Sequence, residues 1–113
     1  MTFQNLRVYQ AAELLDEIVL ALVACCPRGH AADLDQLKRA SASIGHNIAE
    51  AHGCVHGRKV LHLQIARGSA DETRSILRRL VSRRALSKTS IDKACSLAST
   101  IAKMLTSWIN AIS

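Results

Sequence analysis

Apolar residues recur every three or four positions in four segments of the chain, which is the spacing of amphipathic helices. The first segment runs from Gln4 or Asn5 to Cys26, and its apolar stripe is Leu14, Ile18, Leu22 and Cys25 or Cys26. Pro27 and Gly29 follow this segment. They predict the end of the helix, because proline lacks the amide hydrogen of a helix interior and glycine readily adopts the left-handed cap conformation.

The second and third segments are predicted to form an adjacent pair of helices. The second begins near Asp33, a residue favoured at N-caps, and ends at Gly53. Its inward stripe is Leu34, Leu37, Ser41, Ile44 and Ile48. After a turn at residues 52–57, the third helix covers residues 58–85 and faces inward with Ala66, Ala70, Thr73, Ile76, Leu77 and Leu80. Gly68 interrupts it at a cost of up to about 1 kcal/mol relative to alanine, which indicates a tight helix crossing.

The fourth segment follows a short loop at residues 86–88, with Thr89 or Ser90 as the expected N-cap. Its inward positions are Ile91, Cys95, Ala98, Ile101 or Ala102, Leu105 and Ile109. Helices of about 20 residues joined by short loops alternate in direction. The sequence therefore predicts an all-α protein, an antiparallel up-and-down four-helix bundle that forms one domain over residues 1–113.

The composition supports a helical protein outside the membrane. The chain is 49% hydrophobic with one proline, five glycines and three aromatic residues. Its longest apolar run, residues 18–26, is about half the length of a membrane-spanning helix. Because the N-terminus also lacks the pattern of a signal peptide, we expect a cytoplasmic protein. The four cysteines, Cys25, Cys26, Cys54 and Cys95, are then expected to be free thiols and small buried residues.

Positive charge is concentrated in the third predicted helix. Residues 58–84 hold eight basic side chains against Asp71 and Glu72, so their net charge of +6 equals that of the whole chain. On a helical wheel two stripes lie away from the apolar face: Arg67, Arg74 and Arg78 form one, and Arg79 and Arg83 the other. Asp71 can pair with Arg67 or Arg74, and Glu72 with Arg79. The basic side of this helix is thus either a solvated surface that is partly neutralised by ion pairs or a surface that attracts polyanions.

Two polar motifs within the apolar pattern resemble the signatures of a known family. The first motif is Ser43, Ile44, Asn47, Ile48, Ala49 and Glu50, and the second is Gly68, Ser69 and Glu72. Phe3, Leu6 and Tyr9 and the ending Ser107-Trp108-Ile109 extend the likeness over nearly the whole chain. The chain resembles the four-helix-bundle proteins of intervening sequences in bacterial 23S rRNA genes, which are related to the accessory variability determinant of diversity-generating retroelements. Ala51 departs from the usual family glycine, and Gly53 can take over its role.

The resemblance implies a homopentamer with a basic outer surface, and in the retroelement branch it implies binding of nucleic acid and of a reverse transcriptase. A pentamer would raise the charge of +6 fivefold to +30. We therefore expect a non-enzymatic, basic, homo-oligomeric accessory protein that binds RNA or DNA and assists a retroelement reverse transcriptase. The expected phosphate contacts are Arg67, Arg74, Arg78, Arg79 and Arg83. The alternative is a structural or protein-interaction bundle, encoded in an rRNA intervening sequence, with no direct role on nucleic acid.

The other candidate residues are better explained by structural roles than by catalysis or metal binding. Asn47, Glu50, Ser69 and Glu72 suggest a metal-binding or catalytic bundle, but such sites add Glu-x-x-His pairs that this chain lacks. A buried polar network that fixes helix register or a subunit contact explains them better. His52, Cys54 and His56 could hold zinc, but their alternating spacing favours a structural or solvated role. We expect no enzyme activity, no cofactor and no metal.

The sequence indicates binding without recognition of particular bases. No segment resembles a recognition helix or a platform for base stacking, so base-specific readout is not expected. Trp108, near the C-terminus, has Leu105, Ile109 and Ile112 around it. It belongs either to the core or to a subunit interface, where aromatic residues are enriched.

Overall fold

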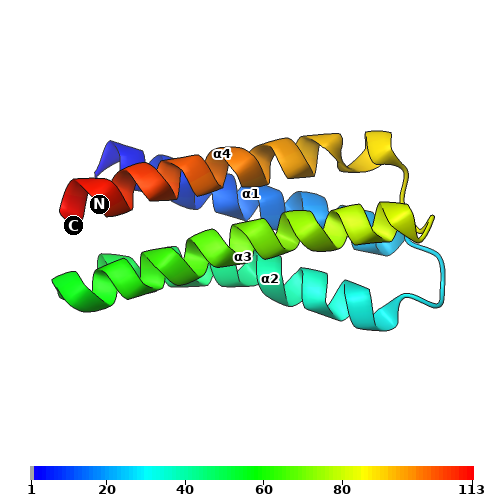
Figure 1. The fold of residues 1–113 in the computed structure, drawn as a ribbon, viewed down its shortest axis with the longest axis horizontal. Helices are drawn as coiled ribbons and strands as arrows, with labels where there is room; N and C mark the ends of the chain where they lie inside the picture. Colours follow the sequence, from blue (N-terminus) through cyan, green and yellow to red (C-terminus); the bar gives the residue numbers. More distant parts are fainter. Residues whose placement is uncertain (1) are drawn as a thin grey trace.

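The computed structural model describes residues 2–113, apart from the side chains of Phe3 and Gln4, so Met1 of the predicted domain lies outside it. The chain forms four helices: α1 (Phe3–Cys25), α2 (Ala31–His52), α3 (His56–Ser82) and α4 (Lys88–Ile112). They run alternately in opposite directions along a body of 43 × 22 × 18 Å, with both chain ends at the same end of the bundle (Figure 1). The predicted all-α, up-and-down four-helix bundle is confirmed.

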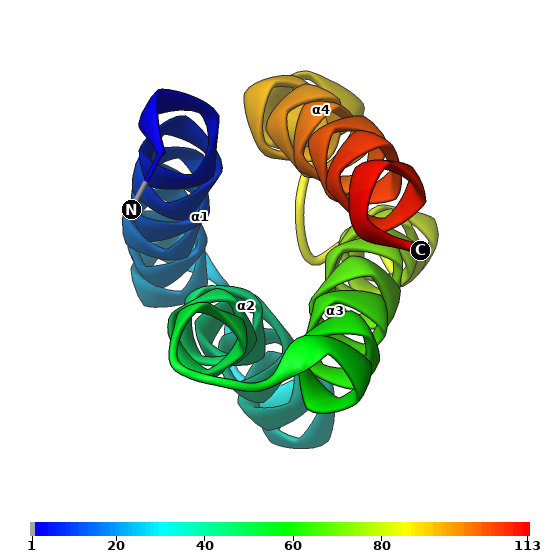
Figure 2. The ribbon, with the colours of Figure 1, turned by 90° about the vertical axis from the view of Figure 1, so that its left-hand side faces the viewer.

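The helices form a ring in which each one packs against its two neighbours (Figure 2). The interior is aliphatic, and its largest fully buried side chains include Leu15, Leu37, Ile44, Ile48, Leu63, Leu77, Leu80, Ile101 and Leu105. Burying each leucine or isoleucine stabilises the fold by about 1.5–3 kcal/mol. The predicted inward stripes of α2, α3 and α4 all contribute to this core, although Leu34 and Cys95 are only half-buried.

The predicted stripe of α1 is wrong in part, because Ile18, Leu22 and Cys26 pack against the core but are only partly buried. Val8, Ala12, Leu15 and Val19 face the core, whereas Leu14 is 42% exposed and Cys25 is exposed. The error arises because α1 carries apolar residues almost all round, so two stripes fit the helical repeat equally well. The helix is oriented instead by a polar contact to α2, in which the Ser41 hydroxyl donates to the Asp16 carboxylate at 2.7 Å.

Several predicted helix ends differ from the structure by a few residues. Asp33 is not the N-cap of α2, because the helix already begins at Ala31 and places Asp33 in its first turn. The N-cap of α4 is Ser87, whose side chain accepts from the Ser90 amide at 3.1 Å, and not Thr89 or Ser90. Likewise α3 begins at His56, inside the predicted turn, and ends at Ser82.

The cysteines are free thiols, but the expectation that they are buried is wrong. Cys25 is exposed, and Cys26, Cys54 and Cys95 are half-buried. Burial raises the pKa of the Cys26 thiol and, against the opposing effect of nearby arginines, that of Cys95. Within residues 2–113 no helix is long and apolar enough to cross a membrane.

Candidate nucleic-acid interface

Three of the five predicted arginines lie where α3 meets α4. Arg67 donates from Nη1 to the Thr106 hydroxyl oxygen of α4 at 3.3 Å, and Arg74 donates from Nη1 to the Ser99 hydroxyl oxygen. Arg74 also forms the expected ion pair with Asp71, at 3.7 Å. Because the α4 partners are neutral hydroxyls, they hold the guanidinium groups in place without cancelling their charge.

Arg78 and Lys103 extend this surface. Arg78 follows Arg74 by one helical turn, and both arginines act on the Cys95 thiol of α4, where their positive charge opposes the rise of its pKa. Lys103 is exposed and lies between Ser99 and Thr106 on the same side of α4. We call these four basic residues, Arg67, Arg74, Arg78 and Lys103, the basic strip. Asp71 and Asp92 are the carboxylates beside it, so the strip remains positive overall.

Arg79 and Arg83 lie on the opposite side of α3, against α2. Both pair with Asp33, Arg79 through Nε at 3.1 Å and Arg83 through Nη1 at 2.8 Å. The Asp33 side chain is only 9% exposed, so it needs the opposite charge that the arginines supply. Glu72, the expected partner of Arg79, does not pair with it, since Arg79 instead donates a further hydrogen bond to Gln36 at 3.0 Å. The structure thus separates the five arginines into two groups.

Half of the predicted polar motif forms a hydrogen-bonded chain between α2 and α3. Ser69 donates to the Ser43 hydroxyl oxygen at 2.9 Å, and the Asn47 amide donates to the same oxygen at 3.0 Å. His62 Nδ1 lies 2.9 Å from Asn47 Oδ1 and completes the chain. Sequence reasoning missed His62 as a member, because its partner lies 15 residues away on another helix.

The other half of the motif is exposed. Glu50, Gly68 and Glu72 lie at the outer edge of the α2–α3 pair. The predicted tight crossing at Gly68 is wrong, because a Cβ atom built there would meet nothing within 4 Å. The packing of a single subunit therefore does not require a glycine at this position.

The remaining candidate residues, the histidines and Cys54 of the predicted turn and Trp108, do not come together in a metal-binding or catalytic site. His52 and His56 are exposed and Cys54 is half-buried. No three His, Cys, Asp or Glu side chains in the described part of the chain are grouped to hold a metal ion. Trp108 is half-buried and lies on the side of α4 that faces α1, where it lines a cavity.

Comparison with known proteins agrees with the four-helix fold. Residues 4–107 match the family described as 23S rRNA-intervening sequence protein. No curated protein sequence matches the chain. A crystal structure of a protein of unknown function from the S23 ribosomal protein family of Bacteroides thetaiotaomicron has a TM-score of 0.88 and 22% identity, covering 96% of this chain and 99% of that one. This likeness shows the shared fold, and the sequence match shows that the chain belongs to the 23S rRNA-intervening sequence protein family.

Proposed function

We propose that this protein is a non-enzymatic accessory protein that binds the phosphate backbone of RNA or DNA through the basic strip. The observation that carries the proposal is that neutral hydroxyls of α4 hold Arg67 and Arg74 in place. An arginine that is already ordered loses less side-chain freedom when a phosphate binds it. A neutral hydroxyl partner does not compensate the charge of the guanidinium, although the exposed Asp71 offsets part of the charge of Arg74.

The dimensions of the strip suit a nucleic-acid backbone. From Arg67 to Arg78 the helix rises by about 16 Å, which corresponds to roughly five phosphates along one strand. Four phosphate contacts per subunit predict that affinity falls roughly 50-fold for a single strand and roughly 150-fold for a duplex when salt rises from about 50 to about 200 mM. This contact is to the backbone, so the binding is independent of base sequence.

The cellular role that we propose follows the resemblance described above. The protein forms a homopentamer, in which five basic strips act together, and it assists the reverse transcriptase of a retroelement with RNA or an RNA/cDNA hybrid as the ligand. Multiple strips on one particle raise the overall affinity for a long strand without any new contact. The ending Ser107-Trp108-Ile109, typical of the retroelement branch, supports this assignment.

The test reverses two arginines of the strip. Arg74→Glu with Arg78→Glu should abolish binding to a structured RNA and to duplex DNA, measured by fluorescence anisotropy at the two salt concentrations. The matched control reverses Arg28 and Arg58, which are exposed and lie outside the strip. Each Arg→Glu substitution changes the net charge by −2, so both double variants lower it from +6 to +2. If both variants bind with wild-type affinity, the assignment is wrong; if both lose affinity equally, net charge matters and the strip does not.

A second candidate, a protein-interaction bundle, is favoured by the outer face of α2 and α3. Leu61 is 53% exposed and Ile65 is 42% exposed there, close to the open Gly68. Such a face suits a subunit neighbour or another protein, with the arginines docking acidic groups. Light scattering of the RNA-binding samples gives the number of subunits, and competition with a generic RNA separates the two candidates. A protein partner that RNA does not displace would favour the second.

A further inference from the structure

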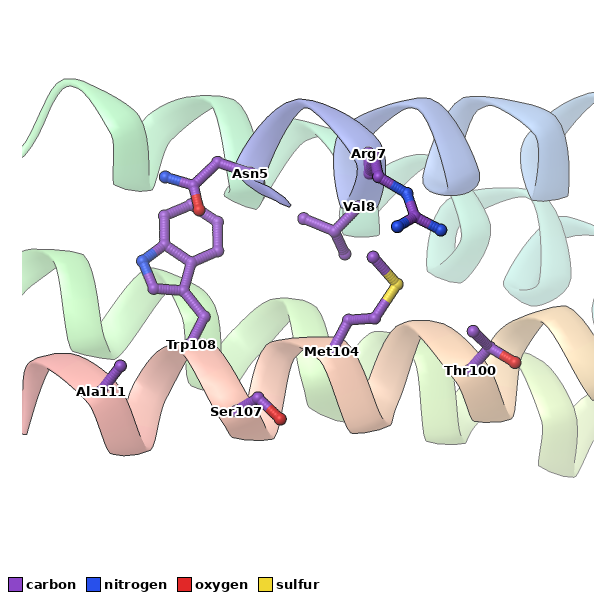
Figure 3. Close-up of a pocket in the computed structure, with 8 residues that line it drawn as sticks. All are labelled: Asn5, Arg7, Val8, Thr100, Met104, Ser107, Trp108 and Ala111. Carbon is purple, nitrogen blue, oxygen red and sulfur yellow. The ribbon is translucent and has the colours of Figure 1, made fainter. Parts of the chain in front are cut away.

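A cavity of about 400 Å³ opens between the start of α1 and the end of α4, on the other side of α4 from the basic strip. Its lining residues are Asn5, Arg7, Val8, Thr100, Met104, Ser107, Trp108 and Ala111 (Figure 3). This volume is within the range of sites that hold small molecules. Among the lining residues that the structure describes there is no carboxylate, and the charged one, Arg7, is basic.

The side chains divide the cavity into an apolar wall and a polar rim. Trp108 and Met104 extend from α4 toward α1, where Asn5 lies beside the indole and Val8 faces Met104 (Figure 3). An indole face and a thioether accept a flat ring, while an amide both donates and accepts at the edge of such a ring. The guanidinium of Arg7 favours a negative group attached to that ring.

We propose that this cavity takes one unpaired nucleobase of a bound single strand, stacked on Trp108, with the adjoining phosphate near Arg7. The ligand class is a single-stranded nucleic acid, and the inference rests on the proposed function. Each base presents a flat face, so the capture does not depend on which base it is. A duplex is not a ligand of the cavity, because its bases are paired and stacked inside.

The position of Trp108 supports a binding role beyond core packing. Ile101, Leu105 and Ile109 already fill the inward stripe of α4 and are buried. Trp108 is only half-buried and lines the cavity from outside that stripe. Trp108 packs partly against the core, and the rest of its side chain borders the cavity. No segment of the sequence resembles a stacking platform, but a single ring suffices for one base.

The cavity and the basic strip are continuous across α4. Lys103 belongs to the strip, and Thr100 and Ser107 lie three and four residues from it, so these side chains are neighbours on the helix surface. Thr100 and Ser107 also line the cavity. A strand that follows the strip can therefore cross α4 beside Lys103 and place one base between α4 and α1.

The experiment uses the intrinsic fluorescence of Trp108, which is the only tryptophan of the chain. The full-length protein is titrated with a uridine oligonucleotide of about ten residues, with an RNA duplex of the same length and with inorganic phosphate. Stacking predicts that the single strand quenches the fluorescence and that the duplex and phosphate do not. Equal quenching by single strand and duplex, or quenching by neither while both bind, overturns the proposal.

Two variants test the same contact by affinity. Trp108→Leu should weaken single-strand binding roughly 5- to 150-fold, the range of one base stacked on an aromatic ring, and leave duplex binding unchanged. Ser107→Leu fills the cavity from an exposed position and keeps Trp108, so it should weaken single-strand binding in a protein whose fold is not at risk. If both variants bind single strand like wild type, the cavity is not the site. In that case the proposed function is still supported if Arg74→Glu with Arg78→Glu abolishes duplex binding. If the wild-type protein binds no nucleic acid, the proposed function and the base-binding cavity are both wrong.

Discussion

Replacing Asp33 with asparagine should destabilise the bundle by about 2 kcal/mol. Asp33 joins the first turn of α2 to the last turns of α3, since both Arg79 and Arg83 donate to its carboxylate. Asparagine has the same size but no charge, and it offers one acceptor oxygen where aspartate offers two. The substitution therefore removes a connection between two helices without creating a cavity.

The magnitude follows from the exposure of the partners. A hydrogen bond to a charged group is worth about 1.5–3 kcal/mol, and a solvent-exposed ion pair about 0–1 kcal/mol. The side chains of Arg79 and Arg83 are 38% and 58% exposed, so each contact to Asp33 is worth about 1 kcal/mol, where these two ranges meet. The negative charge of Asp33 near the N-terminus of α2 adds about 0.5 kcal/mol. The asparagine oxygen still accepts one hydrogen bond and so keeps part of this stabilisation, and the expected loss is about 2 kcal/mol.

Urea unfolding followed by circular dichroism measures this loss directly, and the melting temperature should fall by about 8 °C. The control is Asp35→Asn, the same chemical change two positions later. Asp35 is 65% exposed and pairs with Lys38 at 3.7 Å, so the control should cost less than about 0.5 kcal/mol. Equal effects of the two substitutions would refute the reasoning, because they would show that the contacts to Arg79 and Arg83 add nothing.

Two further predictions concern Gly68 and the thiols. Gly68→Ala should stabilise the subunit against urea by about 0.5–1 kcal/mol, because alanine favours the helix and its Cβ meets nothing within 4 Å; a destabilised variant would show that another chain packs at this position. At pH 8 the exposed Cys25 should react with a thiol reagent faster than Cys26 and Cys95, because burial raises the pKa of the latter two from 9.0 and so lowers their thiolate fraction. The stability that these protonated thiols contribute is fully present below pH 9 and declines as the pH rises above it, which alkaline melting curves can check.

The sequence predicts the number, order and direction of the helices, because each of α2, α3 and α4 has one dominant apolar stripe, even though α3 also exposes Leu61 and Ile65. It fails for α1, where apolar residues at Leu14 and Leu20 compete with the true inward positions such as Leu15 and Val19. Periodicity identifies a face only when the other faces are polar. The orientation of α1 depends instead on contacts to α2 and α4, which the spacing within one helix does not contain.

The candidate site was predictable as far as it depends on one helix. The separation of Arg67, Arg74 and Arg78 from Arg79 and Arg83 follows from the helical repeat, and the structure confirms it. The expected pair of Arg74 with Asp71 on the same helix forms, but the partners of the arginines on other helices were not predictable. Asp33 is 46 and 50 residues from its two arginines, so no rule on neighbouring positions in a helix could find it.

The two sides of α3 therefore have different electrostatic roles although both are arginine-rich. Against α2, a nearly buried carboxylate neutralises half of the charge of Arg79 and Arg83 and uses them to join two helices. Against α4, neutral hydroxyls order Arg67 and Arg74, and the carboxylate that pairs with Arg74, Asp71, is itself exposed. If nucleic acid binds the basic strip, Asp33→Asn should reduce stability yet leave affinity for RNA at least as high as in the wild type, since it removes a negative charge and no strip residue. A parallel loss of stability and affinity in this variant would instead place the phosphate contacts at the α2–α3 side, on Arg79 and Arg83.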